Sequence, residues 1–150
     1  MTSYATPDPA AESVTTAATV AHLPRVLIIE DTVELGEIIK AALRNSNVMT
    51  FHETSGATAL ETYHALHPEI VFLDIGLPDM TGWRVLDTIK ATQSDLDHPS
   101  VVVITAYGDA ANRLMGKLQG VYSYLIKPFS LDQIRQVVAE ILASRSSSAA

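Results

Sequence analysis

The sequence contains no cysteine and is poor in basic residues. Without cysteine the chain forms neither disulfides nor thiolate metal sites, which is compatible with a reducing compartment, and we expect a cytoplasmic protein. Ten Lys and Arg stand against 17 Asp and Glu, so the formal net charge is -7. Because nucleic-acid binding depends largely on basic residues that neutralise phosphates, this balance argues against a nucleic-acid partner and a DNA-binding part.

Long apolar runs and internal repeats are also absent. No stretch approaches the roughly 20 apolar residues of a membrane span. Residues 1–24 contain no Lys or Arg and no solid apolar block, so they fit neither a secretory signal nor a transit peptide. Their small and polar composition, with three prolines, predicts a disordered leader. A short helix around Ala10 to Val20 is the alternative.

From Arg25 onward, short β-branched runs alternate with segments of helical period. With 47% hydrophobic residues, a chain of 150 residues can bury a core, and its length fits one folded domain, which we expect over residues 25–145. The expected strands cover residues 25–30, 47–53, 69–74, 100–105 and 121–127. The expected helices cover residues 33–45, 55–67, 82–92, 109–119 and 130–145, followed by a flexible tail at 146–150.

Strict alternation of strands and helices predicts right-handed crossovers and a parallel sheet with helices on both faces. Five such units in about 120 residues suit a flavodoxin-like, doubly wound (βα)5 domain better than a barrel of eight units. The expected strand order is 2-1-3-4-5. The unbroken apolar run at residues 70–73 indicates a central strand that is buried on both faces.

Helical periodicity also predicts which residues form the core. The first helix is expected to bury the set Leu35, Ile38, Ile39, Ala42 and Leu43. The fourth helix is expected to bury Leu114, Met115 and Leu118, with some of the three on the expected interaction face as the alternative. Trp83 is expected to pack at the start of the third helix. The five histidines are scattered, and His64 and His67, which share a helix face, are expected to be solvated because a third metal ligand is lacking.

Polar residues stand at the carboxyl ends of four of the expected strands. They are Glu30, Asp31, Asp74, Thr105 and Lys127. In an open sheet of this order, ligands sit just outside these strand ends, so the five side chains are expected to converge on one crevice. Gly76 and Pro78 turn the chain sharply after Asp74, which leaves this carboxylate uncovered.

Three carboxylates in one crevice require a cation. At separations near 6 Å and an effective dielectric near 20, each like-charged pair costs about 3 kcal/mol, which one lysine does not fully offset. Oxygen ligands without Cys or a His cluster favour a hard ion, and a few carboxylates plus water suit Mg²⁺ better than a dedicated Ca²⁺ cage. A carboxylate, a Mg²⁺ site, an ammonium and a hydroxyl together suit phosphoryl transfer.

Four segments of the chain, taken in order, resemble the signature segments of the response-regulator receiver domain of two-component signalling. They are IIED at residues 28–31, FLDIGLPDMTG at 72–82, VITA at 103–106 and YLIKPF at 124–129. The resemblance implies a signalling switch that catalyses only its own phosphorylation and dephosphorylation. Asp74 would accept a phosphoryl group from the phosphohistidine of a sensor histidine kinase or a histidine phosphotransfer protein.

The same resemblance assigns roles to further residues. Mg²⁺, the implied cofactor, would be held by Glu30, Asp31, Asp74 and the backbone carbonyl of Gly76. The phosphoryl group would be contacted by Lys127, the hydroxyl of Thr105 and the backbone N–H of Ala106. Thr105 and Tyr124 would form the switch. The structural turns would be Pro78, Gly82 and Pro128, the last preceded by a cis peptide bond.

The implied output is a protein-interaction face formed by the helix at residues 109–119, the strand at 121–127 and the helix at 130–145. No segment is left for an output domain, so we expect a single-domain regulator with a downstream protein target. The sequence leaves open the cognate kinase, the target and the lifetime of the phosphorylated form. It also leaves open a relay, motility, phosphate-sink or adaptor role, and whether the protein dimerises on phosphorylation.

Some positions depart from the family pattern, and other functions compete with it. Glu30 stands where many members carry Asp, and Tyr122 stands where a polar residue is common, so Tyr122 is expected to serve a partner. Gly76 and Tyr107 flank the expected phosphorylation site, and we hypothesise that Tyr107 slows hydrolysis by shielding it.

A phosphatase with an aspartyl-phosphate intermediate would need a second Asp at the position of Gly76. An FMN carrier would need a Ser/Thr-rich loop where Glu30 and Asp31 lie, and a partner-binding protein without phosphorylation would not need the acid set.

Overall fold

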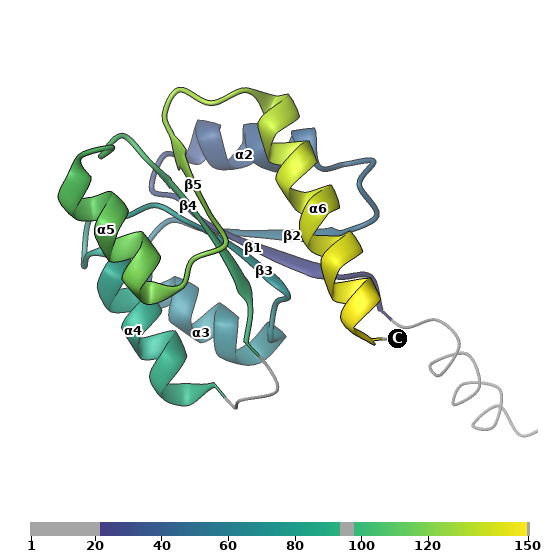
Figure 1. Cartoon of the computed structure of the whole chain (residues 1–150), viewed down its shortest axis with the longest axis horizontal. Coiled ribbons are helices and arrows are strands. Elements are labelled where there is room, and N and C mark those ends of the chain that lie inside the picture. Colours follow the sequence, from purple (N-terminus) through teal and green to yellow (C-terminus); the bar gives the residue numbers. More distant parts are fainter. Residues whose placement is uncertain (1–21, 94–97, 150) are drawn as a thin grey trace, which may run out of the picture.

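The computed structural model describes residues 22–93 and 98–149 (Figure 1), so the expected leader lies almost wholly outside the described residues. The strands within the described part are β1 (Arg25–Ile29), β2 (Met49–Glu53), β3 (Ile70–Leu73), β4 (Ser100–Thr105) and β5 (Ser123–Ile126). The helices are α2 (Val33–Ala42), α3 (Gly56–Leu66), α4 (Gly82–Thr92), α5 (Ala110–Gln119) and α6 (Leu131–Ala149). Among the described helices, none is both long enough and apolar enough to cross a membrane.

The five strands form one parallel sheet in the order β2-β1-β3-β4-β5. This confirms the predicted doubly wound fold and its strand order. Val26 of β1 lies beside Ile70 of β3, which in turn lies beside Ser100 of β4. All four residues of β3 are buried, as expected for the central strand of a parallel sheet that is covered on both faces.

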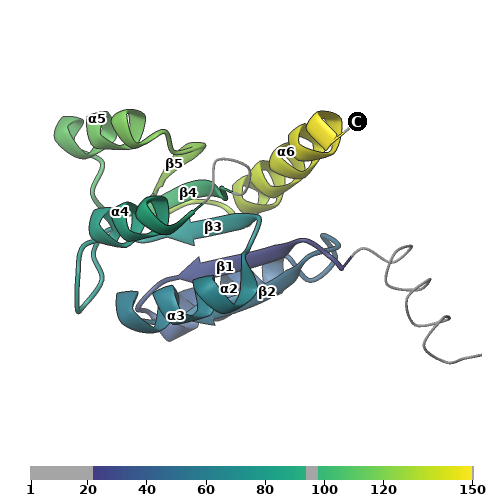
Figure 2. The same ribbon diagram turned by 90° about the horizontal axis from the view of Figure 1, so that it is seen from below.

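Each face of the sheet carries its own hydrophobic core. On one face, α2 and α6 pack over a cluster that contains Ile39, Phe72 and Ile134, each fully buried. On the other face, α3 and α4 pack over a cluster that contains Leu73 and Val85, and α5 lies beside α4 near the β5 edge (Figures 1 and 2). Both cores hold the strands in register, so the strand ends meet along one edge of the sheet.

One core prediction for α2 is wrong. Ile38 is 47% exposed, whereas Ile39, Ala42 and Leu43 are buried and Leu35 is partly buried. The helix approaches the sheet through Gly36, which is buried. At 3.6 residues per turn, Ile38 lies about 200° around the helix from Gly36 and therefore points toward solvent.

The core prediction for α5 is also wrong. Leu114, Met115 and Leu118 are 56%, 38% and 74% exposed, and the buried residue of this helix is Gly116. Because Gly116 brings the helix backbone against the ring of Tyr124, the three large side chains of α5 face outward. They form an apolar ridge on the surface instead of filling the core.

The last helix is longer than predicted. Ser130 and Gln133 form a capping box at its start, in which the Gln133 backbone amide donates to the Ser130 hydroxyl at 3.1 Å and the Ser130 backbone amide donates to the Gln133 side-chain oxygen at 2.8 Å. We expected the helix to end at Arg145, but α6 continues through Ala149. The added residues include neither Gly nor Pro, so nothing in the sequence terminates the helix there.

Asp79 ties the loop after β3 to the start of α3. Its two carboxylate oxygens accept hydrogen bonds from the backbone amides of Gly56 at 2.8 Å and Ala57 at 2.9 Å, and these bonds lower the pKa of Asp79 from its ordinary 3.8. The negative charge also lies at the positive end of the helix dipole. The contact holds in place the loop that follows Asp74.

We therefore expect Asp79→Ala to lower the midpoint of thermal unfolding at pH 7 by about 2–4 °C. Because the folded-state pKa is depressed, this stabilisation is present above the unfolded pKa of 3.8 and is lost as the pH falls through the folded value. Calorimetry at pH 7 and at pH 3 checks this. Glu61→Ala, at an exposed position of α3, is the control, and an equal loss in both variants would contradict the assignment.

Candidate functional site

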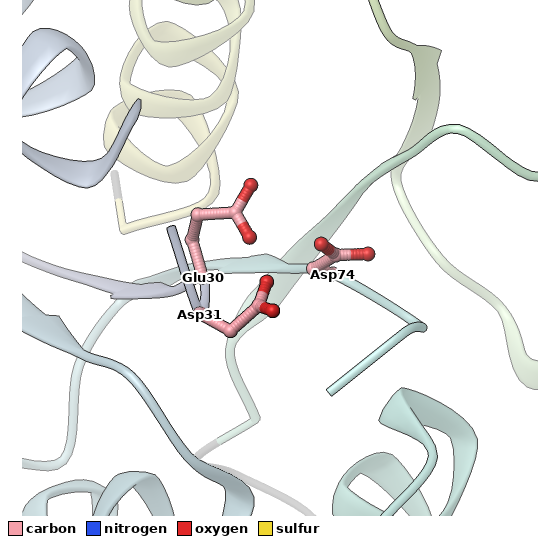
Figure 3. A group of neighbouring side chains, drawn as sticks. All are labelled: Glu30, Asp31 and Asp74. Atoms are coloured by element: carbon pink, nitrogen blue, oxygen red, sulfur yellow. The ribbon is translucent and has the colours of Figure 1, made fainter. Parts of the chain in front are cut away.

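Side chains from the ends of β1, β3 and β5 meet at the carboxyl edge of the sheet. Glu30 and Asp31 follow β1 directly, Asp74 follows β3 and Lys127 follows β5. The Asp74 amide donates to the carbonyl of Ile29 at 3.0 Å, which keeps the ends of β1 and β3 level. In Figure 3 the three carboxylates project into the same space from these two strand ends.

Lys127 connects two of these carboxylates. Its Nζ donates to Oε1 of Glu30 and, at 2.9 Å, to Oδ2 of Asp74. Glu30 is fully buried and Asp74 is 4% exposed, whereas the Lys127 side chain is 24% exposed. The ammonium thus lies between two carboxylates that have little access to water.

These surroundings push the pKa values of the two buried acids apart. Burial, with the nearby Asp74 and Asp31, raises the pKa of Glu30 to about 8. Burial opposes ionisation of Asp74 as well, but hydrogen bonds from Glu30, Lys127 and the Gly76 amide hold its pKa below 3.8. Burial of Lys127 is outweighed by its bonds to both acids, so the pKa of Lys127 is raised. Asp74 is therefore ionised at neutral pH.

The acid cluster fits a divalent cation. One carboxylate oxygen each from Glu30, Asp31 and Asp74 lie within 4.8 Å of one another. Among the side chains that the structure describes, Oε2 of Glu30 is the buried polar atom that lacks a hydrogen-bond partner. A buried carboxylate oxygen without a partner is costly unless an ion or another ligand supplies one. Oxygen donors of this kind match the preference of Mg²⁺.

The loop after Asp74 folds back as its glycines and proline predict. The expectation that the turn leaves the Asp74 carboxylate uncovered is wrong, because Asp74 is 4% exposed and its carboxylate is bonded by Lys127 and the Gly76 amide. The Gly76 amide donates to Oδ1 of Asp74 at 3.0 Å, and Gly76 pairs with Thr81 across the loop. The Gly82 amide closes the loop by donating to the carbonyl of Ile75 at 2.8 Å. Pro78 is exposed at the outer part of this loop.

Thr105 and Tyr124, the predicted switch residues, are connected through Tyr107. Thr105 is buried at the end of β4, and its hydroxyl accepts a hydrogen bond from the Tyr107 amide at 3.2 Å. The Tyr124 hydroxyl donates to the carbonyl of Tyr107. Ala106 is exposed between them. The Lys127 amide donates to the Thr105 carbonyl at 2.8 Å, and the following bond to Pro128 is cis, as predicted.

Sequence reasoning missed two contacts near this edge. The indole N–H of Trp83 donates to the side-chain oxygen of Asn112 at 2.9 Å and so connects α4 with α5. His52, expected to be one of five scattered histidines, has a side chain that is only 7% exposed and contacts the backbone of Glu30. The signal that could have indicated a buried His52 is Gly36, a helix-weakening residue inside an otherwise regular helix.

The fold and the site define a class of protein first. A parallel sheet of order 2-1-3-4-5 with an acid cluster and a lysine at its carboxyl edge is a doubly wound α/β domain, and its acid cluster is suited to a divalent cation. The sequence then identifies the family. Residues 26–139 match the response regulator receiver domain, and the chain belongs to that family. This confirms the resemblance noted from the four sequence segments.

Individual relatives agree with this assignment. The chain is 28% identical over 122 residues to the regulatory protein AtoC of Escherichia coli K12, which covers 81% of this chain and 26% of that protein. It is 27% identical over 122 residues to sporulation initiation phosphotransferase F of Bacillus subtilis 168, covering 81% and 96%. A signal receiver domain from Vibrio parahaemolyticus superimposes with a TM-score of 0.77 at 29% identity, covering 84% and 95%.

The chain spans 26%, 45% and 50% of the length of three curated relatives, and most of a fourth. What it shares with all of them is the receiver domain. Receiver domains belong to phosphorylation-based signalling, in which they accept phosphoryl groups that come from histidine kinases.

Proposed function

We propose that Asp74 is the phosphoacceptor and that phosphorylation depends on Mg²⁺ held by Glu30, Asp31, Asp74 and the carbonyl of Gly76. The phosphoryl donor is a phosphohistidine of a sensor histidine kinase or a histidine phosphotransfer protein. The observation that carries the proposal is the buried Oε2 of Glu30, which lacks a partner beside two further carboxylates. Such an arrangement is stable with a cation and costly without one.

In the proposed reaction, a carboxylate oxygen of Asp74 forms the new bond to phosphorus while the bond between phosphorus and the donor imidazole nitrogen breaks. The electron pair of the broken bond stays on the imidazole. The ionised state of Asp74 supports this role, because only the carboxylate is nucleophilic. Mg²⁺ would offset negative charge on the phosphoryl oxygens. Lys127, the Thr105 hydroxyl and the Ala106 amide supply the remaining contacts to these oxygens.

Phosphorylation changes the charge beside Thr105 by about -1.5 to -2 and biases the arrangement of nearby groups. We infer that Thr105, Tyr107 and Tyr124 pass this change to a face made of α5, β5 and α6. The bonds of Tyr107 to both other residues support this route. The result is a switch that catalyses only its own phosphorylation and dephosphorylation.

A downstream protein target is supported by the shape and chemistry of that face. Between α5 and β5 lies a groove of about 280 Å³, whose lining includes Arg113, Lys117 and Tyr122. Tyr122 is 45% exposed, and Leu114 and Leu118 of the apolar ridge are exposed on α5, the helix that forms one side of the groove. Exposed apolar side chains beside basic groups are typical of a surface that contacts another protein. A second copy of the phosphorylated chain is the alternative occupant.

The proposal is tested by intact-protein mass spectrometry after incubation with acetyl phosphate, with and without Mg²⁺. We expect one added phosphoryl group on the parent in the presence of Mg²⁺ and none on Asp74→Ala. Samples taken within seconds exclude loss by rapid hydrolysis. An adduct that survives the Asp74→Ala change, or that forms equally well in EDTA, would overturn the proposal. No adduct at any time would favour partner binding without phosphorylation.

Tyr107 gives a separate prediction about the lifetime of the phosphorylated form. Its ring lies against Gly76, where an added Cβ would be 3.0 Å from Cε2 of the ring. The ring therefore borders the site where water must approach an acyl phosphate on Asp74. We expect Tyr107→Ala to lose phosphate about 5- to 10-fold faster, a change of about 1 kcal/mol in the barrier.

Loss of the adduct after rapid removal of acetyl phosphate gives this rate directly. Tyr122→Ala, which removes an exposed tyrosine from the groove between α5 and β5, is the matched control. Equal rates for Tyr107→Ala and the parent would refute the shielding role of Tyr107.

A further inference from the structure

His52 occupies an unusual place for a strand residue of the sheet edge. It lies on β2 beside Ile28 of β1, and its side chain is 7% exposed. Its ring nitrogen Nε2 is 2.7 Å from the backbone carbonyl oxygen of Glu30. Because a carbonyl oxygen only accepts hydrogen bonds, Nε2 carries the hydrogen and donates it. The imidazole therefore bonds across from the edge strand to the chain segment that follows β1.

The bonded carbonyl belongs to the peptide that joins Glu30 to Asp31, the two acids of the proposed metal site. The orientation of a planar peptide unit is set by one backbone angle on each side of it. When this carbonyl is held, the backbone directions of both acids are held with it. Glu30 is further fixed by Lys127, whereas Asp31 is exposed, so its placement depends more on the backbone.

Gly36 on α2 leaves room for this imidazole. A Cβ added at Gly36 would lie 1.9 Å from Cε1, 2.2 Å from Nε2 and 2.3 Å from Nδ1 of His52, far inside contact distance. Any other residue at this position would displace the ring. Glycine inside a helix is otherwise unfavourable by comparison with alanine. Gly36 and His52 therefore form one matched pair, in which the helix approaches closely enough to cover the ring.

We propose that His52 is a positioning residue for the metal site and that Gly36 is required to seat it. This inference rests on the proposed function, because it assumes that Glu30 and Asp31 bind Mg²⁺. His52 touches neither the phosphoryl group nor the ion. It acts through the Glu30 carbonyl, as groups behind metal ligands commonly do when they orient those ligands.

The test measures Mg²⁺ binding to the unphosphorylated protein, without any activity assay. The backbone amide signals of Asp74 and Gly76 are followed by NMR while MgCl₂ is added to metal-free protein. We expect His52→Ala to raise the Mg²⁺ dissociation constant about 10-fold or more. His52→Gln, whose amide can still donate to the carbonyl, is expected to stay within about 3-fold of the parent.

A control variant separates positioning from general destabilisation. Phe51 is the neighbour of His52 on β2, but it points to the other face of the sheet and packs against the other core cluster. Phe51→Leu is expected to lower the unfolding temperature without changing the Mg²⁺ dissociation constant. If His52→Ala behaves like Phe51→Leu, or if His52→Gln is as weak as His52→Ala, the positioning role is overturned.

The pairing with Gly36 is tested by a double-mutant cycle. Gly36→Ala alone is expected to weaken Mg²⁺ binding about as much as His52→Ala, because the new methyl group displaces the ring. In the His52→Ala background the same change has no ring to displace and is expected to leave the dissociation constant unchanged. Independent, multiplying effects would overturn the pairing. If the parent itself shows no saturable response to Mg²⁺, the metal site of the proposed function is refuted together with the role of His52. If the parent binds Mg²⁺ and the variants do not differ from it, only the role of His52 is refuted.

Discussion

Glu30→Gln is expected to stabilise the metal-free protein at pH 8 and to remove most of its Mg²⁺-dependent phosphorylation. Glu30 is fully buried and one of its carboxylate oxygens lacks a partner, so its negative charge is costly in the absence of a cation. Glutamine keeps the shape and a group that can accept from Lys127, but it carries no charge. The same change removes an anionic ligand from the proposed Mg²⁺ site.

The pH dependence gives this prediction its sign. The pKa of Glu30 is raised by burial from 4.5 to about 8 in the folded protein. Below pH 4.5, Glu30 is protonated in both the folded and the unfolded protein, and its contribution to the free energy of unfolding is fully present. Between pH 4.5 and 8, Glu30 ionises in the unfolded chain but not in the folded protein, so the free energy of unfolding falls as the pH rises. The loss is at most about 1.4 kcal/mol for each pH unit. In Glu30→Gln this loss is absent, so the variant gains on the parent across that range.

Urea unfolding in EDTA at several pH values between 4.5 and 8 measures the free energy of unfolding of both proteins. Glu30 also shifts the pKa values of Asp74 and Lys127, but in the parent these lie below 3.8 and above 10.5, so the difference between pH 4.5 and 8 reports mainly Glu30. About 10 mM Mg²⁺ is an excess for carboxylate sites of this kind. At this concentration the free energy of unfolding of the parent is expected to rise, whereas that of Glu30→Gln is expected to stay unchanged. Phosphorylation by acetyl phosphate should slow about 100-fold. Parallel stability curves in EDTA would contradict the raised pKa.

The fold could be predicted from the sequence because its signals are local and repeated. Alternation of β-branched runs with amphipathic helices sets the parallel sheet, and the apolar run at β3 marks its buried centre. Errors arose where the depth of a helix depends on a glycine. Gly36 turns Ile38 outward on α2, and Gly116 leaves the large residues of α5 on the surface. Hydrophobic periodicity records which residues are apolar, but not how closely a helix approaches the sheet.

The candidate site could be predicted in part for a similar reason. Strand ends of a parallel sheet meet at one edge, so polar residues at those positions are expected to converge, and Glu30, Asp74 and Lys127 are in direct contact. The contacts that support the site follow no short pattern. Asp79 bonds to amides more than 20 residues away and His52 bonds to a carbonyl 22 residues away, so both depend on tertiary structure. Gly36 indicates that α2 approaches a neighbour closely, but a single sequence contains no local signal that names the partner in either pair.

Lys127→Met is expected to have the second large effect, and it tests the role of the ammonium apart from that of the metal. Lys127 is the cation that bridges Glu30 and Asp74, and methionine has a similar length without the charge. Removing one partner of a buried ion pair commonly costs about 3–5 kcal/mol. Because the Lys127 side chain is 24% exposed, we expect a smaller loss of about 1–3 kcal/mol in the free energy of unfolding in EDTA.

The functional consequence of Lys127→Met follows from the same contacts. Without the ammonium, negative charge on the phosphoryl group and on Asp74 is offset by the metal alone, so phosphorylation at saturating Mg²⁺ should slow about 100-fold. Initial rates of adduct formation with acetyl phosphate measure this, and Lys40→Met, on the partly exposed side of α2, is the control.

Because Mg²⁺ also neutralises the two carboxylates, it should restore much of the stability that Lys127→Met loses, but little of the lost phosphorylation rate. If saturating Mg²⁺ restored both, the ammonium would have no role beyond charge balance in the metal-free protein. A slow but fully stable variant in Mg²⁺ would instead assign Lys127 to the phosphoryl group itself.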